Sequence, residues 1–353
     1  MTEKHRKSWT RFASIAAAGI VSIALAITGC SAEPSPAPPE EGGPLLLAAD
    51  NGSPNFTRNF NPFSGSKRTM VSVIYEPLFV VNSLDGTMTP FLGTEYQQPD
   101  AKTIEVGIRP SVTWSDGEDF TAEDVGFTYN LLKEFSALDA TGVWQYIDTI
   151  DVGDGTVTFH LKEGDVPAAS IVLTVPIVPE HIWSSIADPV TETMEDPVGT
   201  GPYTLGTFTP TQYTLTKNED YWQADKVAAP ELIIPASNSE LEIMSKPYGW
   251  AYSFISDVEN TWVTARDGNR YWFPPGGTVS VFPNLTKAPF DNVDFRRGLS
   301  LSLDRAKIAD LAEEGYVEPA GQSGLLLPNQ KDWLDPSLPD GGAITQDADA
   351  AAD

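Results

Sequence analysis

Cysteine and histidine are scarce in this sequence. Cys30 is the only cysteine among 353 residues, so no internal disulfide can form and the stability of the fold depends on its core. Of three histidines, only His160 and His181 follow residue 30, and neither has a His/Cys spacing typical of a metal site. The sequence therefore predicts no metal site and no cofactor.

Basic residues are also few. The chain has 22 Lys and Arg residues against 49 Asp and Glu residues, which gives a formal net charge of −27. Such a surface repels nucleic acid and anionic lipid headgroups, so both are poor candidates as partners. The apolar fraction of 41% and the nine Trp residues suffice for a folded core, and the length favours two or more subdomains.

No group of residues forms a recognisable catalytic site. Residues 321–324 (GQSG) lack the spacing of a nucleophile elbow, and no helix or Lys follows residues 199–202 (GTGP), as a phosphate loop requires. Carboxylate pairs are common in so acidic a chain, and a pair becomes a glycosidase site only through its separation in space. We predict that the protein is not an enzyme, with a secreted hydrolase as the alternative.

Residues 1–30 have the composition of a lipoprotein signal peptide. Four basic residues precede an uncharged apolar run over residues 12–27, and residues 27–30 (ITGC) place small side chains before Cys30. A retained transmembrane anchor is the alternative for an apolar run of this length. The position of the lone cysteine favours lipidation of Cys30 and a lipid anchor on the outer face of the cell membrane. Residues 31–43, rich in Pro and Glu, are expected to form a disordered linker.

Hydrophobic periodicity predicts a mixture of strands and helices. We expect a buried first strand at 44–49, strands at 103–108 and 156–161, two strands over 203–215, and helices over 67–79 and, as a pair, 290–312. Asp304 is expected to cap the second helix of that pair, and Thr121 with Asp124 forms a capping box before a helix. Isolated strands mixed with helices favour the α/β class with mixed sheets.

Four segments of the chain resemble, in order, the motifs of one protein family. They are residues 114–129 (WSDGEDFTAEDVGFTY), 197–203 (PVGTGPY), 218–222 (NEDYW) and 284–305 (NLTKAPFDNVDFRRGLSLSLDR). Together they are similar to the family 5 extracellular solute-binding proteins of bacterial ABC importers, which serve as receptors for oligopeptides, dipeptides, nickel or oligosaccharides.

The resemblance implies a two-lobed, periplasmic-binding-protein-like fold of type II. Lobe one would span residues 44–237, with an extra subdomain at about 91–192, and an incomplete second lobe would span residues 238–353. Members of the family continue well beyond the point that corresponds to Asp353. We therefore expect this chain to be a C-terminally truncated fragment.

The resemblance also indicates which residues line a cleft between the lobes. In lobe one it points to Asn61, Tyr75 and Glu76 near the cleft mouth, and in the second lobe to Asn284. Aromatic residues are dense between positions 248 and 282, and large rings suit a cleft that closes over extended ligands. Of these aromatics, we expect Trp250, Phe254 and Trp272 to contact the ligand.

The sequence thus predicts a monomeric, lipid-anchored, extracytoplasmic receptor that captures short peptides and delivers them to an ABC permease. An oligosaccharide is the alternative ligand, because the run at 271–275 (YWFPP) resembles the branch of the family that takes sugars. A lipoprotein that uses the fold for signalling or adhesion, without transport, is an alternative from another class.

Overall fold

A computed structural model describes residues 42–50, 52–164, 168–237, 239–253, 255–274, 279–319, 330, 335, 337 and 346–351. The expected signal peptide, Cys30 and nearly all of the expected linker lie outside the described residues. Of the helices that are described, none is long and apolar enough to cross a membrane.

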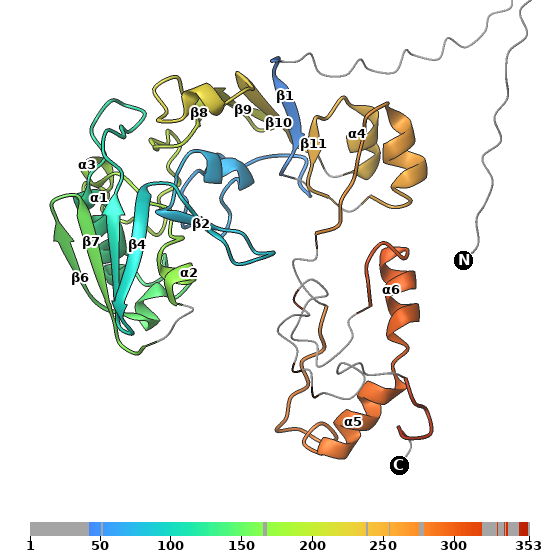
Figure 1. The fold of residues 1–353 in the computed structure, drawn as a ribbon. Coiled ribbons are helices and arrows are strands. Elements are labelled where there is room, and N and C mark those ends of the chain that lie inside the picture. The colour runs from blue at the N-terminus through green and yellow to red at the C-terminus, as the bar shows by residue number, and fades with distance from the viewer. Residues whose placement is uncertain are drawn as a thin grey trace, which may run out of the picture. The chain divides into compact units, whose positions relative to one another are not determined.

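The first large sheet has five strands in the order β11-β1-β10-β9-β8 (Figure 1). Their bounds are β1 (Leu45–Ala48), β8 (Tyr203–Thr209), β9 (Gln212–Lys217), β10 (Glu231–Pro235) and β11 (Trp250–Ala251). Strand β1, next to the edge strand β11, is parallel to both β10 and β11. Strand β9 is antiparallel to both of its neighbours, β8 and β10. The sheet therefore joins segments that lie about 200 residues apart in the chain.

The second large sheet has four antiparallel strands in the order β4-β5-β7-β6. Their bounds are β4 (Gly93–Asp100), β5 (Thr103–Ile108), β6 (Ile147–Gly153) and β7 (Thr156–Leu161). Ile104 and Val106 of β5 and Phe159 of β7 are buried, and helix α1 (Ala122–Glu134) packs against β6 and β7. The residues expected to form the extra subdomain, about 91–192, include this sheet and α1.

The remaining elements are short. They are the hairpin β2 (Phe79–Val81) and β3 (Met88–Pro90), the helices α2 (Ala168–Val172), α3 (Glu180–Trp183), α4 (Glu240–Ser245), α5 (Val293–Ser302) and α6 (Arg305–Glu313), the 3₁₀ turns η1 (Thr69–Val73), η2 (Val143–Gln145) and η3 (Ala224–Lys226), and the π-helical turn η4 (Glu259–Val263).

Two hydrophobic cores hold these elements together. The larger core contains buried residues from both large sheets, from α1 and from the segment around η1. The smaller core packs Ala48 of β1 against Ile243 of α4, Tyr248, Val258 and Trp262. Residues between 243 and 262 thus pack on the sheet that contains β1. The sequence assigned these residues to the second lobe, and the lobe boundary at 237/238 stays a prediction.

Most predicted elements are present, and one helix is much shorter than expected. The strands at 103–108 and 156–161 and the hairpin around residue 210 are confirmed. Asp304 caps α6, its Oδ1 accepting a hydrogen bond from Lys307 N at 2.9 Å. The helix predicted over 67–79 is wrong in length: η1 ends at Val73, because the carbonyls of Ile74 and Glu76 accept bonds from Gly201 N and Ile177 N instead of continuing a helix.

Candidate ligand-binding site

The order of the strands in the five-stranded sheet marks one of its edges as a binding site. β1 lies between β10 and β11, and the three strands run in parallel. Their carboxyl ends therefore meet at the same edge, and the chain moves from one side of β1 to the other between β10 and β11. Open sheets with parallel strands bind ligands at such a switch point, beyond the carboxyl ends of the strands.

A cavity of about 360 Å³ lies at this edge. It is lined by Pro54, Thr211, Gln212, Pro235, Ala236, Ser237, Glu242 and Lys246. Three segments meet around it, because Gly52 N donates to Ser237 O and Ala236 N donates to Thr211 O, each at 2.8 Å. A larger cavity of about 490 Å³ is lined by residues between Ser185 and Thr193, but none of these residues belongs to a strand of the five-stranded sheet.

Among the described residues that line the cavity at the sheet edge, the charged side chains come from the α4 region. Lys246 Nζ forms an ion pair with Glu242 Oε1, and both side chains are partly exposed. The hydrogen bond from Lys246 lowers the pKa of Glu242, so the carboxylate is ionised at neutral pH. An exposed pair of this kind contributes little to stability and can exchange its internal partner for a charged group of a ligand.

Two aromatic rings stand beside the same edge. Trp250 in β11 and Tyr252 just after it stack on each other, with ring centroids 6.1 Å apart and planes 14° from parallel. Their exposed fractions are 46% and 70%. Residues two apart in an extended segment face the same side, so both rings are on one side of the strand, where exposed aromatic surface suits a planar or ring-shaped ligand.

The three residues predicted in lobe one lie in its interior. Asn61 is fully buried, and its Nδ2 donates to Pro189 O at 3.1 Å and to Glu192 O at 2.8 Å. Tyr75 and Glu76 are each 1% exposed. This geometry favours a positioning role for all three residues. Their direct contact with a ligand stays a prediction.

The predicted residues of the second lobe have varied positions. Trp250 lies in the short strand β11. Trp272 is 67% exposed, and Asn284 closes a local turn in which its Oδ1 accepts from Thr286 N at 3.0 Å; neither lines the cavity at the sheet edge. Phe254 lies outside the described residues.

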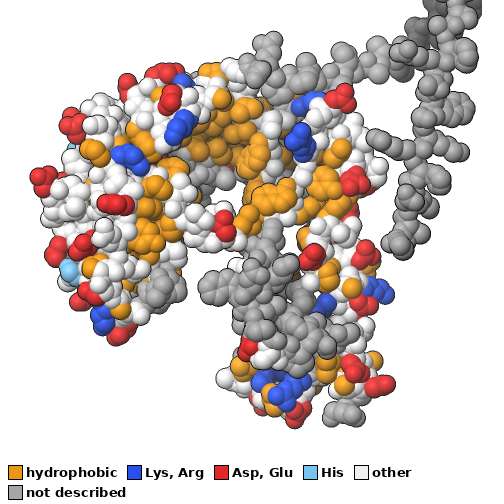
Figure 2. Space-filling model, in the orientation of Figure 1, with side chains coloured by type: hydrophobic (Ala, Val, Ile, Leu, Met, Phe, Trp, Pro, Cys, Tyr) orange, Lys and Arg blue, Asp and Glu red, His pale blue; other side chains and the backbone are white. Residues whose placement is uncertain are grey.

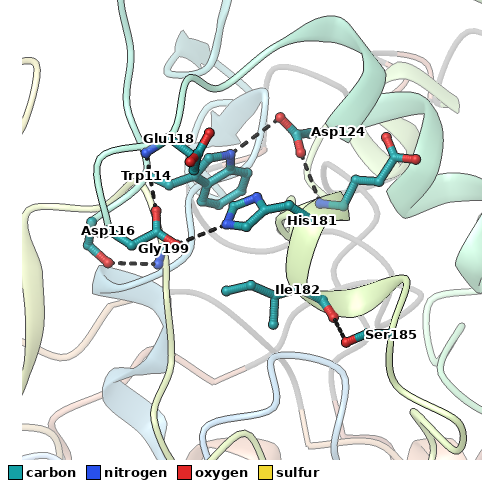
Figure 3. A network of polar contacts seen from close by, with 10 residues as sticks. Trp114, Asp116, Glu118, Asp124, His181, Ile182, Ser185 and Gly199 are labelled. Atoms are coloured by element: carbon teal, nitrogen blue, oxygen red, sulfur yellow. Dashed lines mark hydrogen bonds and ion pairs between the residues drawn. The ribbon is translucent and has the colours of Figure 1, made fainter.

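The first of the four motifs holds a scaffold together rather than lining a cavity. The buried carboxylate of Asp124 accepts a hydrogen bond from Trp114 Nε1 at 3.3 Å (Figure 3). It also accepts hydrogen bonds from Thr121 N at 3.0 Å and from Glu180 N at 2.9 Å. Asp116 Oδ2 pairs with His181 Nε2 at 2.9 Å (Figure 3). These contacts join the turn before α1 to α3, and they give the imidazole of His181 a structural partner in Asp116. Among the described residues, no three His, Cys, Asp or Glu side chains group as a metal site would require.

The sequence model of the family described as "Bacterial extracellular solute-binding proteins, family 5 Middle" matches residues 87–352. The chain belongs to family 5 of the bacterial extracellular solute-binding proteins. Members of this family are binding proteins rather than enzymes, and they act outside the cytoplasm.

Relatives of this solute-binding protein resemble it over most of its length, in sequence or in fold. Protein XP55 of Streptomyces lividans is 28% identical over 344 residues, which cover 89% of this chain and 60% of XP55. The periplasmic oligopeptide-binding protein of an ABC transporter from Thermotoga maritima superposes with a TM-score of 0.78 at 24% identity, covering 88% of this chain and 61% of that one. Its mannohexaose-bound form gives a TM-score of 0.71 at 23% identity, with the same coverage.

These likenesses confirm the predicted α/β fold class with mixed sheets, of the type II periplasmic-binding-protein kind. The chain spans about 60% of the length of these relatives. The residues that line the cavity, such as Ser237, Glu242 and Lys246, were not predicted from the sequence. The available signal was a buried apolar run, ELIIP at 231–235, followed by polar residues, but its meaning depends on which strands lie beside it.

Proposed function

We propose that this family 5 solute-binding protein is the substrate-binding part of an ABC importer and that it captures short peptides. The observation that carries the proposal is the cavity at the switch point of the five-stranded sheet, lined by one carboxylate and one ammonium. A peptide presents an ammonium and a carboxylate at its ends and neutral amides between them. Glu242 and Lys246 offer the complementary charges, while Thr211, Gln212 and Ser237 offer neutral hydrogen-bonding groups. The relative from Thermotoga maritima is named as an oligopeptide-binding protein, which favours this ligand class, and its mannohexaose-bound form makes a sugar the second candidate.

The mechanism that we propose is closure of two lobes around the ligand. A ligand that binds the closed form more tightly than the open form shifts the population towards the closed form. The membrane permease would then accept the ligand from the closed receptor. We propose that the receptor acts as a monomer, without a cofactor, and is held at the outer face of the membrane through lipid on Cys30.

Calorimetric titration of the purified protein with a library of di- to pentapeptides tests this proposal. We expect binding of some peptides and a loss of about tenfold or more in affinity for Lys246→Met and Glu242→Gln, because each change leaves one terminal charge of the ligand unpaired. Lys217→Met is the matched control, since Lys217 forms an ion pair with Glu219 and does not line the cavity. The proposal fails if no peptide binds, or if the control weakens binding as much as the two cavity variants.

An oligosaccharide is the second candidate ligand, and the stacked pair of Trp250 and Tyr252 favours it. A flat aromatic surface packs well on the apolar face of a sugar ring. If sugars are the ligand, manno- or cello-oligosaccharides bind where peptides do not. Trp250→Ala then abolishes binding, and Trp250→Phe, which keeps a ring, retains most of it.

A further inference from the structure

The two segments that connect the five-stranded sheet with the four-stranded sheet cross next to Glu76. One segment leaves η1 and enters β2, and the other leads through residues 198–202 into β8. Gly201 N donates to Ile74 O at 2.9 Å. A Cβ built on Gly199 would lie 1.9 Å from Ile74 O, so the crossing is too close for any residue but glycine.

The side chain of Glu76 holds a third segment against this crossing. Its Oε1 accepts a hydrogen bond from Tyr221 OH at 2.7 Å, and Trp222 Nε1 donates to both carboxyl oxygens, at 3.3 Å and 3.2 Å. The backbone carbonyl of Glu76 accepts from Ile177 N at 3.0 Å. One residue thus joins β2, the loop at 218–222 and the segment before α3.

The loop at 218–222 is bonded to the other crossing segment as well. Asn218 Nδ2 donates to Gly201 O at 3.1 Å, and Asn218 N donates to Pro202 O at 2.9 Å. Three segments far apart in sequence, which include the second and third motifs of the family, therefore meet around one buried carboxyl group.

The charged and titratable groups that face Glu76 are Arg109 and Tyr221. Arg109 follows β5; its guanidinium carbon lies 3.9 Å from the centroid of the Trp222 ring, and its side chain donates to the Phe91 carbonyl. Burial raises the pKa of Glu76 to about 7, while the Tyr221 hydrogen bond and the charge of Arg109 act in the opposite direction. The carboxyl group therefore titrates near neutral pH.

We propose that Glu76 is a positioning residue that acts as a proton-dependent latch, holding the loop at 218–222 and the crossing at Gly199–Gly201 against the start of β2. The latch holds most firmly when Glu76 is protonated, because the neutral carboxyl keeps acceptor positions for Tyr221 and Trp222 without the cost of a buried charge. As the pH rises through neutrality, the buried carboxylate forms and the contact loosens. The proposal goes beyond ligand capture and does not depend on which ligand the protein binds.

Fluorine NMR of the full chain labelled with 5-fluorotryptophan tests the latch directly. Replacement of Trp222 by Phe identifies the Trp222 signal among those of the nine tryptophans. We expect this signal to shift with a midpoint near pH 7, because its indole N–H donates to the titrating carboxyl. Glu76→Gln is expected to remove the shift, and Glu118→Gln, which changes an exposed carboxylate, is expected to preserve it.

A second variant keeps the test decisive if Glu76→Gln does not fold. Tyr221→Phe removes one donor to the carboxylate, so the midpoint of the Trp222 signal should rise by about one pH unit, a tenfold gain in proton affinity. A Trp222 signal that does not move over about two pH units on either side of neutrality overturns the proposal. The same holds for a shift that persists in Glu76→Gln or a midpoint that Tyr221→Phe leaves unchanged.

Discussion

Residues 42–237 and residues 279–319 contain similar apolar patterns but bury them very differently. The first region supplies all of the buried residues of the larger core, from Leu47 to Ile234. In the second region no residue is buried, and Phe282, Phe295 and Leu311 are 90%, 41% and 73% exposed. Helices α5 and α6 still form there, with side-chain caps at Asn292 and Asp304.

The difference shows what local signals can do where the described side chains are not buried. Caps and helical spacing satisfy backbone groups within a few residues of the chain, so they can define a helix by themselves. Burial of an apolar stripe requires a second surface, and most of the stability of a helix in a protein comes from that packing. The acidic surface is a third feature that needs no tertiary partner: Asp and Glu side chains are scattered over the face drawn in Figure 2.

The largest expected effect comes from truncating matched aromatics in the two regions. Phe159 in β7 is fully buried, and Phe159→Ala should reduce the free energy of unfolding by about 3–5 kcal/mol. Phe295→Ala in α5, where the residue is 41% exposed, should cost less, about 1 kcal/mol, because a large part of its surface is already in water and truncation removes less buried area. Urea unfolding followed by tryptophan fluorescence measures both; equal losses would contradict the comparison.

A glycine at the crossing near Glu76 should have the next largest effect. Gly199→Ala places a Cβ 1.9 Å from Ile74 O, and relieving that clash requires a backbone shift that should cost about 3 kcal/mol. Gly65→Ala is the control, since a Cβ there meets no atom within 4 Å. Thermal unfolding of both variants decides the point, and a Gly199→Ala protein as stable as Gly65→Ala would remove the steric argument.

The pH dependence of stability sharpens the comparison between buried and exposed carboxyl groups. The pKa of Glu76 is raised from 4.5 to about 7, so this group stabilises the folded state fully below its unfolded pKa. That stability, about 3 kcal/mol at most, is lost as the pH rises from about 4.5 to about 7. Glu76→Gln should flatten the unfolding free energy over this range, whereas Glu318→Gln, on an exposed side chain, should not change the profile.

The smallest expected effect concerns the cap of α6. Asp304→Ala removes the acceptor for Lys307 N and should cost about 1 kcal/mol of helix stability. Because α6 buries no residue, hydrogen exchange should become faster in α6 while the strands of the four-stranded sheet keep their protection. Unchanged exchange in α6 would show that the cap does not stabilise this helix. Faster exchange in both α6 and the four-stranded sheet would show that the two regions do not open independently.

Much of the fold could be predicted from sequence because its signals are local. Alternation at Ile104, Val106 and Ile108 located β5 and its buried face, and the capping box at Thr121 located the start of α1. The helix predicted over 67–79 was too long because the carbonyls that would have continued it bond to residues more than 100 positions away.

The candidate site was far less predictable. Of the proposed ligand-binding residues that the structure describes, only Trp250 lies at the edge where β10, β1 and β11 end. Asn61, Tyr75 and Glu76 are polar or aromatic residues in family-like segments, and nothing in the sequence distinguishes a side chain that faces the core from one that faces a ligand. Their burial follows from partners such as Glu192 and Tyr221, which lie about 130 to 145 positions further along the chain.

By itself the sequence determined the family, the α/β class, the acidic surface, and the caps and alternations of individual elements, because each depends on residues within a few positions of one another. Only the tertiary structure decided that β1 lies between two parallel strands, that Ser237, Glu242 and Lys246 share a cavity, and that Glu76 is enclosed by Tyr221 and Trp222. The reason is that strand order and burial are set by contacts between distant segments. The hydrophobic pattern of a single segment does not show which other segment it contacts.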